Sequence, residues 1–108
     1  MDPHLSEGQA LSFQTIRNYQ ERAVYELMGE IAPRYPSLCQ SEELLADVAC
    51  LALNALSPRY IRHEVDLHFF MTNKERALNR LAVCKAIEAA FEHIERAERA
   101  GIGREGAR

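Results

Sequence analysis

Hydrophobic residues recur every three or four positions in three stretches of the chain, which predicts three α-helices. The first stretch covers residues 13–32 and ends before Pro33 and Pro36, because proline disfavours the helical conformation in the residue that precedes it. Its hydrophobic stripe consists of Ile16, Tyr19, Ala23, Val24, Leu27, Met28 and Ile31. This spacing predicts a helix with one face in a core and the opposite face in water.

The second predicted helix follows Ser41, whose hydroxyl can cap it, and runs to about residue 56, just before Pro58. Glu42 and Glu43 fall in its first turn, where the helix dipole favours acids. From residue 48 to residue 56 Asn54 is the only polar residue, so no face is left for water. The two other helices of the same chain are too few to bury all sides of such a segment. We therefore expect an intertwined homodimer; the alternative is a compact monomer in which this helix is sandwiched.

The third predicted helix covers residues 73–100 and begins at a capping box formed by Thr72 and Glu75. Its expected stripe is Ala77, Leu81, Cys84, Ile87, Phe91 and Ile94. Val65, Leu67 and Phe69 alternate with polar residues, which predicts a short extended segment before this helix.

The expected fold class is all-α. A three-helix domain covers residues 13–100, with the short extended segment between helices two and three. Residues 1–12 are expected to form a flexible leader because they lack hydrophobic periodicity. Residues 101–108 are expected to form a flexible tail because three of these eight residues are glycine.

Charge and length narrow the range of functions. The chain has 108 residues, 13 basic and 16 acidic, and a net charge of -3. Nucleic-acid-binding domains usually carry a basic excess, so we expect nucleic acid not to be a partner. The longest unbroken apolar run, residues 48–53, is far shorter than the ~20 residues that span a bilayer. The N-terminus has no signal-peptide pattern, so we expect no membrane span and a cytoplasmic location.

Neither a metal site nor a catalytic centre is predicted. Cys39, Cys50 and Cys84 form no C-x-x-C pair, and Cys50 and Cys84 are expected to be small core residues. His63 and His68 are five residues apart in an extended segment, whereas a zinc-protease motif needs four on a helix. The sequence also has no nucleophile elbow and no phosphate-binding loop of the Walker type. We expect no cofactor and no enzymatic activity.

The residues after Pro58 are the strongest candidates for a binding site. Arg59 and Arg62 carry forked guanidinium groups suited to phosphate, and Tyr60 offers a ring face for stacking. With His63 they form a run without any acid, which can bind a phosphate-bearing small molecule. The alternative is structural: the arginines pair with Asp47, Glu21 or Asp66 and hold the loop.

Asp47 and Asn54 interrupt the second helix seven residues apart, so they lie on one side of it. We interpret them as buried polar anchors, with Asp47 accepting from an Arg or Tyr and Asn54 satisfying the loop backbone, because a buried polar group needs a partner. The alternative is that they contact a ligand or a metal.

Two stretches of the chain resemble the late competence development protein ComFB family of bacteria, whose motifs are N-Y-x-E-x-x-V and D-V-x-x-L-A-L-N-x-L-P-P-x-Y. This chain has Ser57 where the family often has the first proline of the second motif. The matching residues are Asn18, Tyr19, Glu21, Val24, Asp47, Val48, Leu51, Ala52, Leu53, Asn54, Leu56, Pro58 and Tyr60. The resemblance covers about residues 16–95 and adds Asn18, Tyr19 and Glu21 to the expected polar anchors. Many family members carry C-x-x-C before the aspartate towards a metal site. Here Ser41 and Leu44 take those positions, so we expect no metal.

The resemblance implies a small, helical, dimeric, non-enzymatic protein linked to competence, DNA uptake and pili. Some members of the family are associated with cyclic dinucleotide second messengers, which fits a loop containing Arg59, Tyr60 and Arg62. The first hypothesis is therefore a regulatory protein that binds cyclic di-GMP or cyclic di-AMP. The second is a protein–protein adaptor of the competence or pilus machinery with no small ligand.

Overall fold

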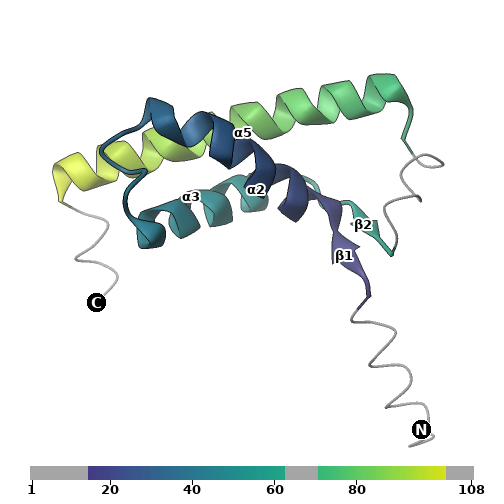
Figure 1. Ribbon diagram of the computed structural model, residues 1–108, viewed down its shortest axis with the longest axis horizontal. Helices are drawn as coiled ribbons and strands as arrows, with labels where there is room; N and C mark the ends of the chain where they lie inside the picture. Colours follow the sequence, from purple (N-terminus) through teal and green to yellow (C-terminus); the bar gives the residue numbers. More distant parts are fainter. Residues whose placement is uncertain (1–14, 63–70, 102–108) are drawn as a thin grey trace, which may run out of the picture.

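The computed structural model describes residues 15–62 and 71–101 and confirms the three-helix, mostly α architecture. The elements in chain order are β1 (Arg17–Asn18), α2 (Tyr19–Ile31), the 3-10 helix η1 (Ala32–Arg34), α3 (Glu42–Ala55), β2 (Tyr60–Ile61) and α5 (Asn73–Ala100) (Figure 1). The predicted leader, the predicted extended segment around residues 65–69 and the predicted tail beyond residue 101 lie outside the described residues.

Local capping sets where the helices begin. Ser41 Oγ accepts from the Leu44 N–H, and Thr72 and Glu75 form the predicted capping box, so α3 and α5 start where the sequence indicates. The first helix starts later than predicted, at Tyr19, because Asn18 caps it and the preceding residues are extended. Arg17 and Asn18 pair antiparallel with Ile61 and Tyr60, so the chain entering α2 and the chain leaving α3 form one small sheet.

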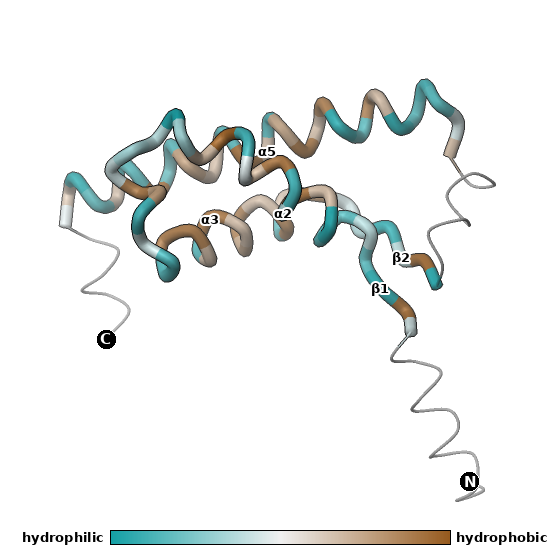
Figure 2. Tube along the Cα trace, in the orientation of Figure 1, coloured by the Kyte–Doolittle hydropathy of each residue, from teal (hydrophilic) through white to brown (hydrophobic). Residues whose placement is uncertain are grey.

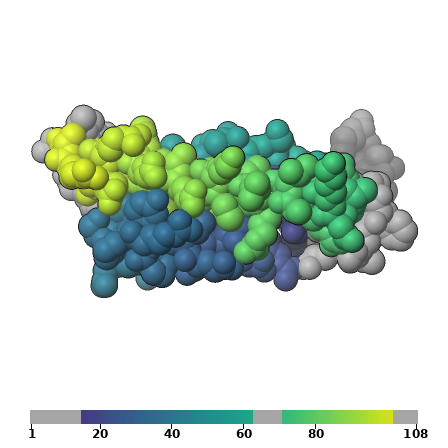
Figure 3. Space-filling model, turned by 90° about the horizontal axis from the view of Figure 1, so that it is seen from above, coloured from purple at the N-terminus to yellow at the C-terminus, as the bar shows by residue number. Residues whose placement is uncertain are grey.

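The core lies between α2, α3 and α5, with α3 packed most extensively against α5. Seen from above, α5 runs along the length of the molecule with α2 and α3 on either side (Figure 3). The central core residues are Val24, Leu27, Met28, Ile31, Leu38, Leu44, Val48, Ala52, Val83, Ile87, Ala90 and Phe91. Phe91 is fully buried and stacks on Tyr35 with ring centroids 4.5 Å apart and planes 3° from parallel. This stack ties the turn after α2 to α5.

The buried face of α5 differs from the predicted stripe in its first half. Val83 and Ala90 are buried together with Ile87 and Phe91, whereas Leu81 is 57% exposed. Spacings of three and four fit both stripes, so the pattern along the chain did not distinguish Val83 from Leu81. The observed face is the one that α2 and α3 contact together.

The prediction that Cys50 is a core residue is also wrong. Cys50 lies on the outer face of α3, which turns its opposite face to α2 and α5. Leu51, Asn54 and Ala55 are exposed on this outer side as well. Sequence composition predicted a helix without a solvent-facing side, yet within the described part of a single chain α3 keeps one side uncovered.

Hydrophobic positions also continue along α5 into its first turns, which extend past the ends of α2 and α3 (Figures 1 and 2). Leu78 and Leu81 of α5 are each 57% exposed. In the residues that the structure describes, no helix combines the length and the apolar character needed to cross a membrane.

Phe91→Ala should lower the free energy of unfolding by about 3–5 kcal/mol, because it leaves a cavity beneath Tyr35 and removes the stacked pair. Urea unfolding followed by circular dichroism measures the effect. Tyr25→Ala is the matched control. This aromatic residue is 57% exposed on α2, and its loss should change stability by no more than about 0.5 kcal/mol. Equal losses in the two variants would contradict the assigned core.

Candidate functional site

The candidate site is the segment that we call the Arg59 loop, residues 57–62. It follows α3, includes β2 and carries three of the predicted ligand-binding residues, Arg59, Tyr60 and Arg62. Its backbone is held by the beginning of α2. Asn18 Oδ1 accepts from the N–H of Gln20 at 3.2 Å and from the N–H of Arg59 at 2.7 Å. The Tyr19 N–H donates to the Arg59 carbonyl oxygen at 2.6 Å. One asparagine therefore caps α2 and fixes the Arg59 loop.

A buried glutamine joins the same loop to α5. Gln20 is 3% exposed. Its Nε2 donates to the Ser57 carbonyl oxygen at 3.1 Å and to Asn79 Oδ1 at 2.8 Å, and its Oε1 accepts from Asn79 Nδ2 at 3.0 Å. Among the described residues no buried side-chain nitrogen or oxygen lacks a hydrogen-bond partner. The two amides thus form a reciprocal pair, which we call the Gln20–Asn79 pair.

The predicted ligand-binding side chains lie on the surface of this anchored loop. Arg59 and Arg62 are exposed, and Tyr60 is 68% exposed. His63 lies outside the described residues. Backbone anchoring with exposed side chains is an arrangement suited to binding, because the loop need not be ordered at the moment of contact.

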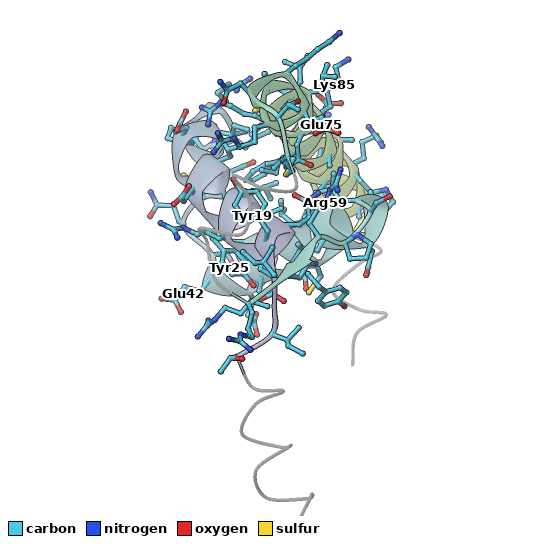
Figure 4. All side chains as sticks on the ribbon, turned by 90° about the vertical axis from the view of Figure 1, so that its right-hand side faces the viewer. Tyr19, Tyr25, Glu42, Arg59, Glu75 and Lys85 are labelled. Atoms are coloured by element: carbon cyan, nitrogen blue, oxygen red, sulfur yellow. The ribbon has the colours of Figure 1, made fainter. Side chains whose placement is uncertain are left out.

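In the view of Figure 4, Arg59 lies below Glu75, which belongs to the first turn of α5. The pKa of Glu75 is lowered from its usual 4.5, chiefly by the hydrogen bond that its carboxylate accepts from the Thr72 N–H, with smaller contributions from the Thr72 hydroxyl and from the positive charge of Arg59. The carboxylate accepts from the Thr72 N–H at 2.8 Å. Glu75 is therefore ionised at neutral pH, and its negative charge is attracted to the positive charge of Arg59.

The predicted polar anchors divide into two groups. Asn18 and Tyr19 contact the Arg59 loop through the hydrogen bonds described above. Asp47 and Asn54 are exposed on the outer side of α3, and Glu21 is exposed on α2. Because both side chains are exposed, the interpretation of Asp47 and Asn54 as buried anchors does not hold for the single chain. Their helix turns its other face inward.

Sequence reasoning missed Gln20, Asn79 and Glu75 as neighbours of the loop. A signal was present for the glutamine. Gln20 stands four residues before Val24 on the buried face of α2, where a polar residue needs a specific partner. Nothing local identified the partner, because Asn79 is 59 residues away in the sequence.

No group of three or more metal-binding side chains occurs among residues 15–62 and 71–101.

A family model described as late competence development protein ComFB matches residues 17–98 of the 108-residue chain. No curated protein and no solved structure matches the chain.

Arg59→Gln should raise the pKa of Glu75, because it removes a nearby positive charge, and an NMR pH titration of the Glu75 carboxyl carbon measures this. The ionised Glu75 stabilises the fold above pH 4.5, and this contribution is lost as the pH falls through its lower folded pKa. Arg96→Gln is the control, since Arg96 lies on the same helix about 30 Å away, beyond the Debye length. Identical Glu75 pKa values in the wild type and Arg59→Gln would show that the two groups are not neighbours.

Proposed function

The chain belongs to the late competence development protein ComFB family, and from this premise we propose that it is a non-enzymatic regulatory protein whose Arg59 loop binds a cyclic dinucleotide. The observation that carries the proposal is the anchored backbone of Arg59, fixed at both its N–H and its carbonyl oxygen, beneath exposed charged and aromatic side chains. A late-competence role follows from the family. The ligand is our inference.

The chemistry of the loop matches the chemistry of this ligand class. A cyclic dinucleotide carries two phosphates and two purine bases. The guanidinium groups of Arg59 and Arg62 can donate two parallel hydrogen bonds to a phosphate, and the ring of Tyr60 can stack on a base. The chain as a whole has a net charge of -3, so long-range attraction does not favour polyanions such as DNA. A small ligand held by local contacts is therefore favoured over nucleic acid.

A homodimer fits the same ligand. Cyclic di-GMP and cyclic di-AMP have two equivalent halves, and a two-fold axis near the Arg59 loops would present the same residues to each half. The hydrophobic residues that a second copy can cover are Leu51 on α3, 36% exposed, and Leu78 and Leu81 on α5, each 57% exposed. A cytoplasmic location accompanies this proposal, in keeping with three unpaired cysteines.

A second candidate function is a protein–protein adaptor of the competence or pilus machinery. The exposed Leu78 and Leu81 on the first turns of α5 favour it, because adjacent exposed leucines on one helix are typical of a docking surface. An adaptor needs no contact between Arg59 and a phosphate. The two functions therefore differ in whether the loop arginines matter to binding.

Cyclic di-GMP or cyclic di-AMP should raise the melting temperature of the wild type but not of Arg59→Ala/Arg62→Ala. The reason is that ligand binding to the folded state alone stabilises it, and at a ligand concentration of 100 Kd the gain is about 2.7 kcal/mol. Differential scanning fluorimetry over a nucleotide panel measures the shift.

Arg96→Ala/Arg99→Ala is the matched control for this experiment. It removes the same two charges at the far end of α5 and should keep the full ligand-induced shift. A wild type that shows no shift at millimolar ligand would eliminate the cyclic dinucleotide proposal and leave the adaptor function.

Leu78→Glu/Leu81→Glu should convert a dimeric wild type into a monomer, because four carboxylates would be brought into one apolar contact. Light scattering coupled to size-exclusion chromatography measures the mass. Tyr25→Glu on α2, where Tyr25 is 57% exposed, is the control and should remain dimeric. A monomeric wild type at high micromolar concentration, or a double variant that stays dimeric, would refute this interface.

A further inference from the structure

We propose that the Gln20–Asn79 pair is a positioning device: it sets where the Arg59 loop stands relative to the first turns of α5. The proposal concerns two residues that lie beneath the site and do not contact the ligand themselves. It rests on the proposed ligand-binding function of the loop. It adds to that function by identifying which residues hold the Arg59 loop in a fixed position.

The pair connects three parts of the chain at one point. Gln20 belongs to α2, Asn79 to α5, and Ser57 opens the Arg59 loop. Gln20 Nε2 has two hydrogens and uses one for the Ser57 carbonyl oxygen and the other for Asn79 Oδ1. Since both acceptors depend on the same nitrogen, a displacement of the first half of α5 changes the position available to Ser57.

Asn79 of the pair also lies close in sequence to Glu75, whose charge interacts with that of Arg59. Asn79 follows Glu75 by four residues on α5, about one helical turn, so the two side chains are neighbours on the helix surface. Fixing Asn79 against Gln20 therefore fixes the part of α5 that carries Glu75, whose carboxylate the Thr72 N–H holds in place. On the other side Asn18, two residues before Gln20, holds the Arg59 backbone. The Gln20–Asn79 pair therefore links the part of α2 that holds the Arg59 backbone to the part of α5 that carries Glu75.

The reciprocal geometry makes positioning separable from stability. When both partners of a buried hydrogen-bonded pair are replaced by apolar groups of similar shape, no unsatisfied group remains between them and the cost in stability is small. Such a replacement nevertheless frees the Ser57 carbonyl from Gln20 and removes the directional link to α5. A purely structural pair would change stability and the Arg59 loop in parallel, whereas a positioning pair changes the loop alone.

Gln20→Leu/Asn79→Leu tests the proposal by native-state hydrogen exchange. The Arg59 and Tyr19 amides, which donate within the anchored loop, should exchange about tenfold or more faster than in the wild type, as expected for local opening after loss of one or two hydrogen bonds. The amides of Val48 and Ile87, in the middle of α3 and α5, should keep their wild-type rates.

Two further variants make the exchange result specific. Gln20→Asn/Asn79→Gln exchanges the lengths of the two amides, can restore the reciprocal bonds and should recover protection of the Arg59 amide. Glu30→Gln/Arg80→Gln removes an exposed ion pair that also links α2 to α5, at 3.4 Å, and should leave the loop amides unchanged. If the double-leucine variant does not fold, Asn79→Asp keeps the size, removes the donors to Gln20 and should accelerate the Arg59 amide in the same way.

Ligand affinity provides the second readout. Isothermal titration with cyclic di-GMP should show a dissociation constant about tenfold larger for the double-leucine variant than for the wild type. The melting temperature of the variant should stay close to that of the wild type. A change of about tenfold in affinity is the size expected when about one hydrogen bond that orders the site is lost. A different outcome is that the wild type binds no cyclic dinucleotide while the loop amides of the double-leucine variant still exchange faster than those of the wild type. That pair of results would reject the proposed ligand and keep the positioning role. Wild-type exchange at Arg59 and Tyr19, or equal acceleration throughout α3 and α5, would overturn the positioning role.

Discussion

A side-chain amide buried away from water must find partners for both its oxygen and its nitrogen, and this constraint on Gln20 organises one end of the molecule. Its partners lie in α5 and in the chain that leaves α3, so the three segments meet only in one arrangement. Next to it, the hydrogen bond from the Arg59 N–H to the Asn18 side chain and the short β1–β2 pairing also join the start of α2 to the chain that leaves α3. The end of the domain that carries Arg59 is therefore specified by directional polar contacts, whereas the opposite end is held by the stacked rings of Tyr35 and Phe91.

This division has a consequence for function. Apolar packing between helices tolerates small rotations, but hydrogen bonds lose most of their strength when their geometry changes. A loop that must present guanidinium groups and an aromatic ring in a fixed relation to one another is better anchored by hydrogen bonds than by packing. The attraction between the charges of Arg59 and Glu75 then depends on how α5 packs against α2, which is the relation that we propose the amide pair sets.

The outer side of α3 explains why composition alone gave an incomplete description of this helix. Its sequence is hydrophobic nearly all round, yet only Leu44, Val48 and Ala52 are buried in the single chain. Cys50 and Leu51 stay exposed beside the polar residues Asp47 and Asn54. An amphipathic pattern identifies which face of a helix is buried. A helix without a polar face indicates only that more of its surface must be buried than one chain can bury, and we propose that a second copy of the chain buries the rest.

Much of the fold and part of the candidate site could be predicted from the sequence. The sequence by itself determined where α3 and α5 begin, because Ser41, Thr72 and Glu75 act on backbone groups within one helical turn. It also identified Arg59, Tyr60 and Arg62 as binding candidates from their chemistry. Only the tertiary structure decided that Val83 rather than Leu81 faces the core, and that Gln20 pairs with Asn79. Spacings of three and four fit more than one stripe on a helix, and a hydrogen bond between residues 59 positions apart depends on how the helices pack, which no local pattern encodes.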